Sequence, residues 1–128
     1  MSGVVVDTSV WIDFLAGIPA LPLEEALSRG SVVLSPLVLS ELASGARHQR
    51  EREAIEGLLK ILPLHETPLE HWIHVGKLRR TMQNRGVSVS TPDAHVAQCA
   101  LDLDAVLLSR DAVFSRIARH SALRLHSA

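Results

Sequence analysis

Residues 3–9, Gly3-Val4-Val5-Val6-Asp7-Thr8-Ser9, decide the fold, because a β-branched run ends there at three polar residues. A short apolar run bounded by polar residues is typical of a buried strand. Beyond it, apolar side chains recur at helical spacing at Val10, Trp11, Phe14 and Leu15. We therefore predict a strand that leads directly into a helix, with Asp7 at the junction.

The same alternation continues along the chain. Apolar runs at 31–34 and 105–108 predict further strands, with a brief strand at 63–66 and an edge strand at 122–125. Helical patterns separate them, at 23–29, 37–47, 48–62, 67–86, and from Thr91 and Asp111 onward. Strands alternating with helices favour βαβ units. We expect a three-layer α/β/α domain with a mostly parallel sheet of about five strands.

Composition sets the limits. The chain has 128 residues, of which 47% are hydrophobic and 21% charged, so we expect a single globular domain over residues 1–128. Cys99 is the single cysteine, which excludes an internal disulfide, a zinc finger or an iron–sulfur cluster built from cysteines of this chain. No apolar run approaches the ~18 residues of a membrane span. We expect a cytoplasmic protein with no membrane partner.

Four acidic residues fall where a parallel sheet places its ligand crevice, beyond the carboxyl ends of the strands. Asp7 and Asp111 follow predicted strands, whereas Glu41 and Asp93 lie early in helices that begin at the same edge. Carboxylates crowded together repel one another unless a cation neutralises them. Ligation by oxygen alone suits Mg²⁺ or Mn²⁺ rather than zinc. The pattern therefore predicts a metal site.

Each acid also has an ordinary structural explanation. Asp7 and Asp111 precede helices and could be N-caps, and Asp93 could complement the positive end of a helix dipole. Glu41 could lie on a solvated helix face, although Leu37, Val38 and Gly45 make its neighbourhood apolar and small. Both interpretations stay open at this point.

Four segments together resemble the PIN domain, and in particular the compact VapC-type toxins of bacterial toxin–antitoxin pairs. They are VVVDTSVWIDF (4–14), SPLVLSELASGA (35–46), STPDAHVAQCA (90–100) and AVLLSRDAVFSRIA (105–118), and the resemblance covers nearly the whole chain. It implies a ribonuclease in which Asp7, Glu41, Asp93 and Asp111 bind Mg²⁺ or Mn²⁺ and cleave RNA. Ser9 and Ser109 match hydroxyl positions of the family that support the acids. The resemblance also implies a homodimer and a VapB-like antitoxin.

One position departs from the family, and other functions remain open. Many relatives carry a further aspartate two residues after the last acid, where this chain has Val113. A catalytically silent PIN-fold binding module is therefore one alternative. A second is a phosphohydrolase of the phosphoaspartate type with Asp7 as nucleophile, against which Ser9 counts because a second aspartate is usual there. A receiver-like module lacks its acidic pair and its late lysine.

An RNA nuclease also needs cations beside its carboxylates to hold the phosphates. Arg110 and Arg116 lie closest in sequence to the predicted site, and Lys77, Arg79 and Arg80 form a basic stretch without acids. An ordinary solvated helix face explains the basic stretch equally well.

Histidines and the cysteine receive a structural interpretation. His71 and His74 are helical neighbours with no obvious third metal ligand beyond Glu70, so we interpret them as exposed histidines without a metal. His95, two residues after Asp93, points to a different side of its helix. Cys99 lies among apolar residues and is predicted to be a small buried thiol rather than a nucleophile.

Overall fold

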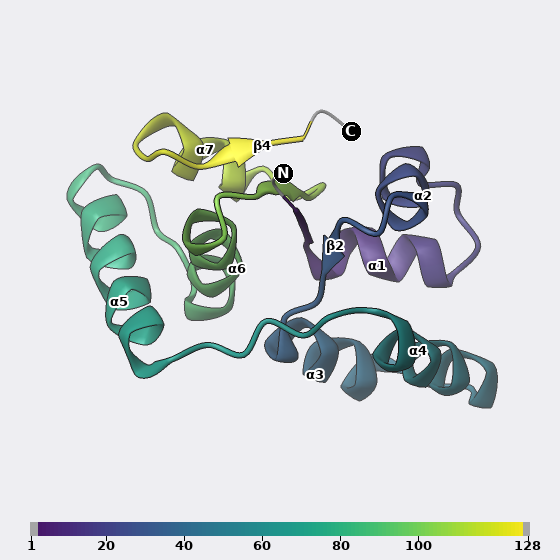
Figure 1. The fold of residues 1–128 in the computed structure, drawn as a ribbon. Coiled ribbons are helices and arrows are strands. Elements are labelled where there is room, and N and C mark those ends of the chain that lie inside the picture. Colours follow the sequence, from purple (N-terminus) through teal and green to yellow (C-terminus); the bar gives the residue numbers. More distant parts are fainter. Residues whose placement is uncertain (1–2, 127–128) are drawn as a thin grey trace.

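The computed structural model describes residues 3–126, in which seven helices surround four short strands (Figure 1). In chain order the elements are β1 (Val4–Val6), α1 (Thr8–Leu15), α2 (Leu21–Ser28), β2 (Val32–Val33), α3 (Pro36–Gly45), α4 (Gln49–Ile61), α5 (Leu69–Asn84), α6 (Thr91–Asp102), β3 (Val106–Leu108), α7 (Val113–Arg119) and β4 (Arg124–Leu125). The predicted α/β fold is confirmed.

The strands form one sheet in the order β2-β1-β3-β4, and every pairing between them is parallel. The central strand β1 pairs Val5 with Val33 on one side and with Leu107 on the other. Because all strands run the same way, their carboxyl ends meet at one edge. The chain leaves β1 and β3 at that edge, and so the residues that follow these two strands become neighbours.

The predicted brief strand at 63–66 is reduced to a single parallel bridge between Leu34 and Leu64. Leu34 N–H donates to the Pro63 carbonyl at 3.0 Å, and His65 N–H donates to the Leu34 carbonyl at 2.9 Å. Proline has no N–H to donate, so the ladder cannot extend through Pro63. The sheet therefore has four strands rather than the expected five or so.

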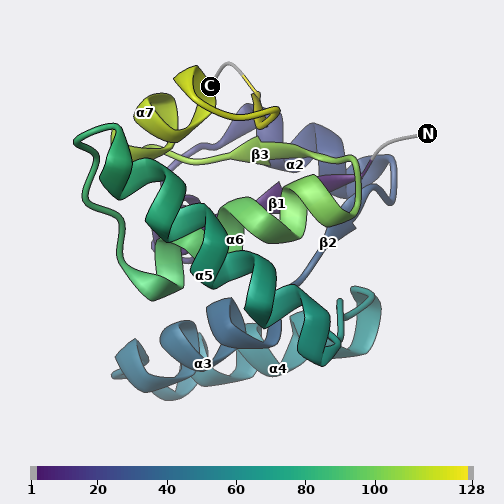
Figure 2. The ribbon, with the colours of Figure 1, turned by 90° about the vertical axis from the view of Figure 1, so that its left-hand side faces the viewer.

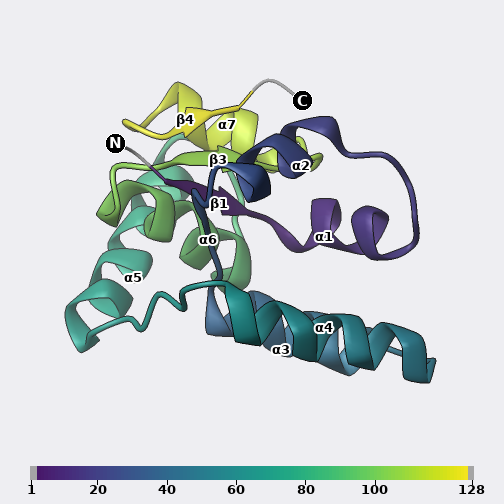
Figure 3. The same cartoon turned by 45° about the vertical axis from the view of Figure 1, so that its right-hand side comes forward.

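Helices cover both faces of the sheet. In Figure 1 β1 and β2 lie between α5 and α6 on one side and α1 and α2 on the other. Figure 2 shows α5 and α6 crossing in front of the strands, and α6 contacts both β1 and α5. Figure 3 shows α3 and α4 side by side below the sheet, where α3 also contacts α1.

The core explains why α6 is the most buried helix. Seven consecutive residues of α6, from Ala94 to Ala100, are buried, because small side chains allow it to pack between the sheet and α5. Trp11 and Phe114 fill the space near the carboxyl edge and are almost fully buried. Within residues 3–126, no helix is both long and apolar enough to cross a membrane.

Candidate active site

Asp7 is the acid held most tightly. It follows β1 directly, and only 7% of its surface is exposed. Two hydroxyls donate to the same carboxylate oxygen, Oδ2: Ser9 Oγ at 2.8 Å and Ser109 Oγ at 2.9 Å. In the described part of the chain, side-chain hydrogen bonds reach that oxygen alone, so Oδ1 stays available for another ligand.

Backbone hydrogen bonds fix this arrangement. Asp7 N–H donates to the Leu108 carbonyl at 2.9 Å, which continues the pairing of β1 with β3 by one step. Arg110 N–H donates to Ser9 Oγ at 3.2 Å, and Asp111 N–H donates to Ser109 Oγ at 3.0 Å. Asp7 occupies the N-cap position of α1, but its side chain makes no capping hydrogen bond. The capping alternative for the Asp7 side chain is therefore wrong.

Glu41 and Asp111 are both exposed at the same edge. Glu41 lies on α3, and its Oε1 accepts a hydrogen bond from Thr8 Oγ1 at 2.8 Å. Asp111 lies between β3 and α7, and its Oδ1 accepts from Val113 N–H at 3.1 Å. The N-cap of α7 is Ala112, which makes no side-chain capping hydrogen bond, so the interpretation of Asp111 as the N-cap is wrong. Val113, which stands where many proteins of the resembled family carry an aspartate, is only 6% exposed and therefore lies in the core.

Asp93 connects the four acids electrostatically. It lies in the first turn of α6, where the N-cap Ser90 accepts a hydrogen bond from Asp93 N–H at 3.2 Å. Burial raises the pKa of Asp93, and the negative charges of Asp111, Asp7 and Glu41 raise it further, against the opposing effect of a hydrogen bond with Ser90. The structure thus brings the four predicted acids close enough to repel one another.

The donor set of this edge fits a hard divalent cation. All four side chains offer oxygen, and the pKa of Asp93 is raised first by burial and then by the negative charges of the other three acids. The four acids do not form a compact ligand cage, because no three of their carboxylate oxygens lie within 4.8 Å of one another. The ligand atoms of His65, His71 and Cys99, by contrast, do lie that close together. Mg²⁺ tolerates the wider spacing of the acids, since it retains several waters and takes one or two carboxylates directly.

Arg110 is the basic residue that the structure places at the acids. Its Nε forms an ion pair with Asp13 Oδ2 of α1 at 2.7 Å, while 43% of the Arg110 side chain remains exposed. Ser109, Arg110 and Asp111 line one side of an open cavity of about 350 Å³. Arg110 is therefore oriented by α1 and still accessible to a ligand.

Arg79 and Arg80 lie at a different place from the acids. Arg79 Nε donates to the Val89 carbonyl at 2.9 Å, and Arg79 and Arg80 line a separate cavity of about 550 Å³ that none of the four acids lines. Lys77 is exposed on α5 and Arg116 is exposed on α7.

Sequence reasoning missed Thr8 and Asp13, which hold Glu41 and Arg110 respectively. The position of Thr8 beside Asp7 was the one available signal, because a hydroxyl next to a site acid can orient a second acid. Asp13 gave no such signal, since its partner lies 97 residues along the chain, from 13 to 110.

The interpretation of His71 as an exposed histidine is wrong, because it is 1% exposed. Its Nδ1 lies 2.6 Å from Asp102 Oδ2, and its Nε2 lies 2.7 Å from Nδ1 of His95, which is also 1% exposed. His95 Nε2 lies 2.7 Å from Ser35 Oγ. The partners of His71, Asp102 and His95, lie on α6. Residue spacing within α5 cannot indicate contacts with another helix, and so the sequence did not predict the burial of His71. The prediction of a buried thiol at Cys99 is confirmed.

Comparison with known proteins gives a consistent result. The family model for the PIN domain matches residues 4–120. No curated protein matches the chain.

Solved structures with the same fold include VapC toxins of VapBC toxin–antitoxin complexes. VapBC-1 from nontypeable Haemophilus influenzae is 25% identical with a TM-score of 0.77, and the match covers 97% of this chain and 96% of that chain. DNA-bound VapBC from Salmonella typhimurium is 22% identical with a TM-score of 0.82, covering 98% of each chain. VapBC2 from Rickettsia felis, bound to a promoter DNA fragment, is 16% identical with a TM-score of 0.79, covering 96% of each chain.

Proposed function

The chain belongs to the PIN-domain family, and on that premise we propose that it is a Mg²⁺- or Mn²⁺-dependent endoribonuclease, the toxin of a VapBC-type pair. The observation that carries the proposal is the electrostatic state of Asp93, whose pKa is raised by burial and then by the charges of Asp111, Asp7 and Glu41. An uncompensated group of oxygen ligands at the carboxyl edge of a parallel sheet is the setting that a catalytic divalent cation needs.

In this proposal Asp7 and Asp93 are the firmest ligands, and Glu41 and Asp111 complete the acidic group or orient a water. Ser9 and Ser109 hold Oδ2 of Asp7 and so turn Oδ1 toward the cation. Thr8 restricts Glu41 in the same way.

A bound divalent cation would lower the pKa of a water, orient the phosphate and offset charge in the in-line transition state of phosphodiester hydrolysis. No side-chain nucleophile is then required. The acids alone would repel RNA, so a cation at their rim must hold a neighbouring phosphate. Arg110 fits that role, because Asp13 fixes its guanidinium while part of it stays exposed.

We also propose an antitoxin partner, which the complexed state of the structural neighbours supports. An apolar groove of about 230 Å³ runs between α1, α3 and α4, and it is lined by Ile12, Leu15, Leu42 and Ile55 beside Glu41. A VapB-like tail in this groove would cover Glu41 and close the acidic edge.

The proposed homodimer and the cytoplasmic location rest on the family as well. Large apolar side chains stay exposed from the end of α4 to the first turns of α5, with Ile61 at 72%, Leu69 at 79% and Ile73 at 52%. Exposed apolar side chains of this size favour a protein interface. Light scattering of the purified chain would test the dimer directly.

The deciding experiment compares wild type with Asp93→Asn, purified identically, on a mixed RNA pool with Mn²⁺, with Mg²⁺ and with a chelator. We expect metal-dependent cleavage that falls at least ~100-fold in the variant, the size typical of losing one group that stabilises transition-state charge. Asp104→Asn is the matched control. The Asp104 side chain is 91% exposed, and its positive φ of 50° is one that asparagine also adopts.

Equal activity of wild type and Asp93→Asn would contradict the proposal and indicate a contaminating nuclease. Metal binding without cleavage of any RNA in the pool would favour the silent binding module instead.

A further inference from the structure

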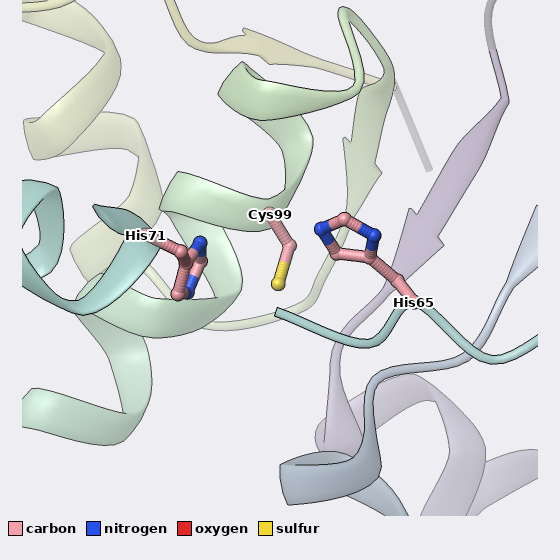
Figure 4. Close-up of side chains that lie close together, drawn as sticks. All are labelled: His65, His71 and Cys99. Carbon is pink, nitrogen blue, oxygen red and sulfur yellow. The ribbon is translucent and has the colours of Figure 1, made fainter. Parts of the chain in front are cut away.

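A second group of metal-ligating side chains comprises the buried His71 and Cys99 and the half-buried His65. His65 comes from the segment before α5, His71 from α5 and Cys99 from α6, and their ligand atoms all lie within 4.8 Å of one another. Figure 4 shows the Cys99 thiol between the two imidazoles. His65 and His71 lie close in sequence, whereas Cys99 comes from a different helix, and the fold brings the three together.

The side chain of His65 independently points to a ligand at this place. Its Nε2 is buried and has no hydrogen-bond partner within the described residues. A buried imidazole nitrogen without a partner loses the hydrogen bond that water would give it, which destabilises the fold. In Figure 4 one ring nitrogen of His65 lies on the side that faces Cys99. A ligand between them would satisfy that nitrogen.

The surroundings of His71 are those of a metal-bound imidazole. Asp102 Oδ2 lies 2.6 Å from His71 Nδ1, and Gln98 Nε2 donates to the other Asp102 oxygen at 2.8 Å. A carboxylate accepts but does not donate, so Nδ1 carries the proton and Nε2 presents its lone pair. A carboxylate on the far nitrogen is the usual support of a metal-ligating histidine, because it fixes the tautomer and raises ligand basicity.

His95 can supply a fourth ligand atom. His95 Nδ1 lies 2.7 Å from His71 Nε2 and 3.9 Å from Cys99 Sγ, and its Nε2 lies 2.7 Å from Ser35 Oγ. In the metal-free chain the His95 Nδ1 proton is shared with His71. If that proton moves to Nε2 and is shared with Ser35, Nδ1 can face a cation.

We propose that His65, His71 and Cys99 form a closed structural site for Zn²⁺, with His95 Nδ1 as its fourth donor. Nitrogen and sulfur ligands in a tetrahedral set are the preference of zinc, whereas Mg²⁺ and Mn²⁺ require oxygen. The site is therefore chemically distinct from the acidic edge. It would clamp the segment around His65 onto α5 and α6.

Binding has a defined proton balance. Burial raises the pKa of the Cys99 thiol to about 12, with the charge of Asp102 adding to the effect, so the metal-free cysteine carries its proton. Zinc binding forms the bond to sulfur and releases that one proton to solvent, whereas each histidine stays neutral and keeps one ring proton.

Cobalt is the sharpest probe, because Co²⁺ takes the zinc geometry and a cobalt–thiolate bond has its own near-ultraviolet absorption band. The full chain is titrated with Co²⁺ alone, both folded and during refolding, since the ligands are buried. We expect about one Co²⁺ per chain, a thiolate band, and displacement of the band by Zn²⁺. Cys99→Ala should abolish the band. His65→Gln should weaken Co²⁺ binding at least ~10-fold without unfolding the chain, because His65 Nε2 makes no hydrogen bond that folding would lose.

The controls separate this site from the proposed nuclease. His120→Gln changes an exposed histidine and should leave the band intact. Asp7→Asn and Asp93→Asn should also leave it intact, because oxygen ligands give no sulfur band, even if the nuclease proposal fails. Absence of the band in both folded and refolded wild type, or its persistence in Cys99→Ala, would overturn the zinc proposal.

Discussion

Helix α6 carries two polar clusters of opposite character. At its N-terminus Asp93 faces three other acids at an open edge, where like charges add to the effect of burial and raise its pKa. Along its buried side, His95 and Asp102 belong to a chain of hydrogen bonds that runs from Gln98 through His71 to Ser35. The acidic cluster has too many acceptors and too few donors, whereas the buried chain supplies a donor for every acceptor along its length.

The difference teaches how one helix serves two purposes. Buried polar groups must find partners within the protein, so the imidazole chain fixes α5, α6 and the start of α3 relative to one another. Asp93 is different: burial and its acidic neighbours disfavour its ionised form, a cost in stability that is typical of functional sites. Altering each cluster should therefore affect different measurements: activity for the acids and stability for the imidazoles.

The largest expected effect is on activity, from Asp7→Asn. The amide keeps the size of the side chain, but it removes the charge that would bind the cation. RNA cleavage should fall ~1000-fold, equivalent to about 4 kcal/mol of transition-state stabilisation. The melting temperature should change little. A variant that melts much earlier would mean that Asp7 serves the fold rather than catalysis.

Next in size is the loss of stability on breaking the buried chain with His71→Ala. Asp102, which is exposed to solvent, and His95, which is buried, would each lose a short hydrogen bond. We expect the free energy of unfolding to fall by about 3 kcal/mol, as when one partner of a buried pair is removed. Urea denaturation measures it, and Lys77→Ala on the exposed face of α5 should change it by less than about 0.5 kcal/mol. A similar small change for His71→Ala would show that water replaces the lost contacts.

Acid should weaken the same cluster in the wild type. Burial lowers the pKa of His95 from 6.5 to about 4, with the neighbouring histidines contributing to the shift. The unfolded chain therefore binds a proton that the folded chain refuses, and stability falls as the pH drops from 6.5 toward 4, by up to about 3 kcal/mol.

Protonation of Asp102 at low pH should also lower the stability of the fold. Burial alone would raise its pKa, but hydrogen bonds from His71 and Gln98 outweigh burial and lower it, so its contribution is lost as the pH falls further. Thermal melts of chelator-treated protein between pH 7 and pH 4 measure the sum. A melting temperature independent of pH over that range would show that His95 is protonated in the fold.

A smaller effect is expected from Ser9→Ala, which removes one of the two hydroxyls on Asp7 Oδ2 and leaves that of Ser109. Cleavage should slow ~10-fold, the lower end for a group that supports a metal ligand. Ser28→Ala at an exposed position of α2 is the matched control. If both variants keep full activity, Ser109 alone orients Asp7.

The smallest expected effect is a gain in stability rather than a loss. A raised pKa means that ionised Asp93 opposes folding at neutral pH, so Asp93→Asn should stabilise the metal-free chain, by less than about 1 kcal/mol. The gain should vanish when Mg²⁺ is added, because the wild type then benefits from the cation. A destabilised variant would show that Asp93 matters more as a helix N-terminal charge than as a member of a repelling group.

The fold could be predicted because its strands are local patterns. Val4–Val6 and Val106–Leu108 are short apolar runs that end at polar residues, and parallel pairing brings those ends together. The bridge at Leu64 was overestimated as a strand, because an apolar residue beside Pro63 does not reveal how many ladder hydrogen bonds can form.

Contacts between helices could not be predicted in the same way. Periodicity indicates which side of a helix is apolar, but it does not indicate which residue of another helix lies opposite. His71 and His95 lie on different helices, so their mutual hydrogen bond was invisible in either pattern. The pairing of Arg110 with Asp13 was hidden for the same reason.

The pairing of β1 with β3 also determines at which point of synthesis Asp7 can gain its hydrogen-bond partners. Ser109, which holds Asp7, lies 102 residues beyond it, and the central strand finds one of its two neighbours only after β3 has been made. Contacts of such long separation form late, since the entropy of closing a large loop must be overcome first. A nascent chain therefore carries Asp7 without its partners until β3 and Ser109 have been made. A ribosome-bound or truncated chain that ends before Ser109 should consequently be inert, which would delay any nuclease activity until the whole domain has been released.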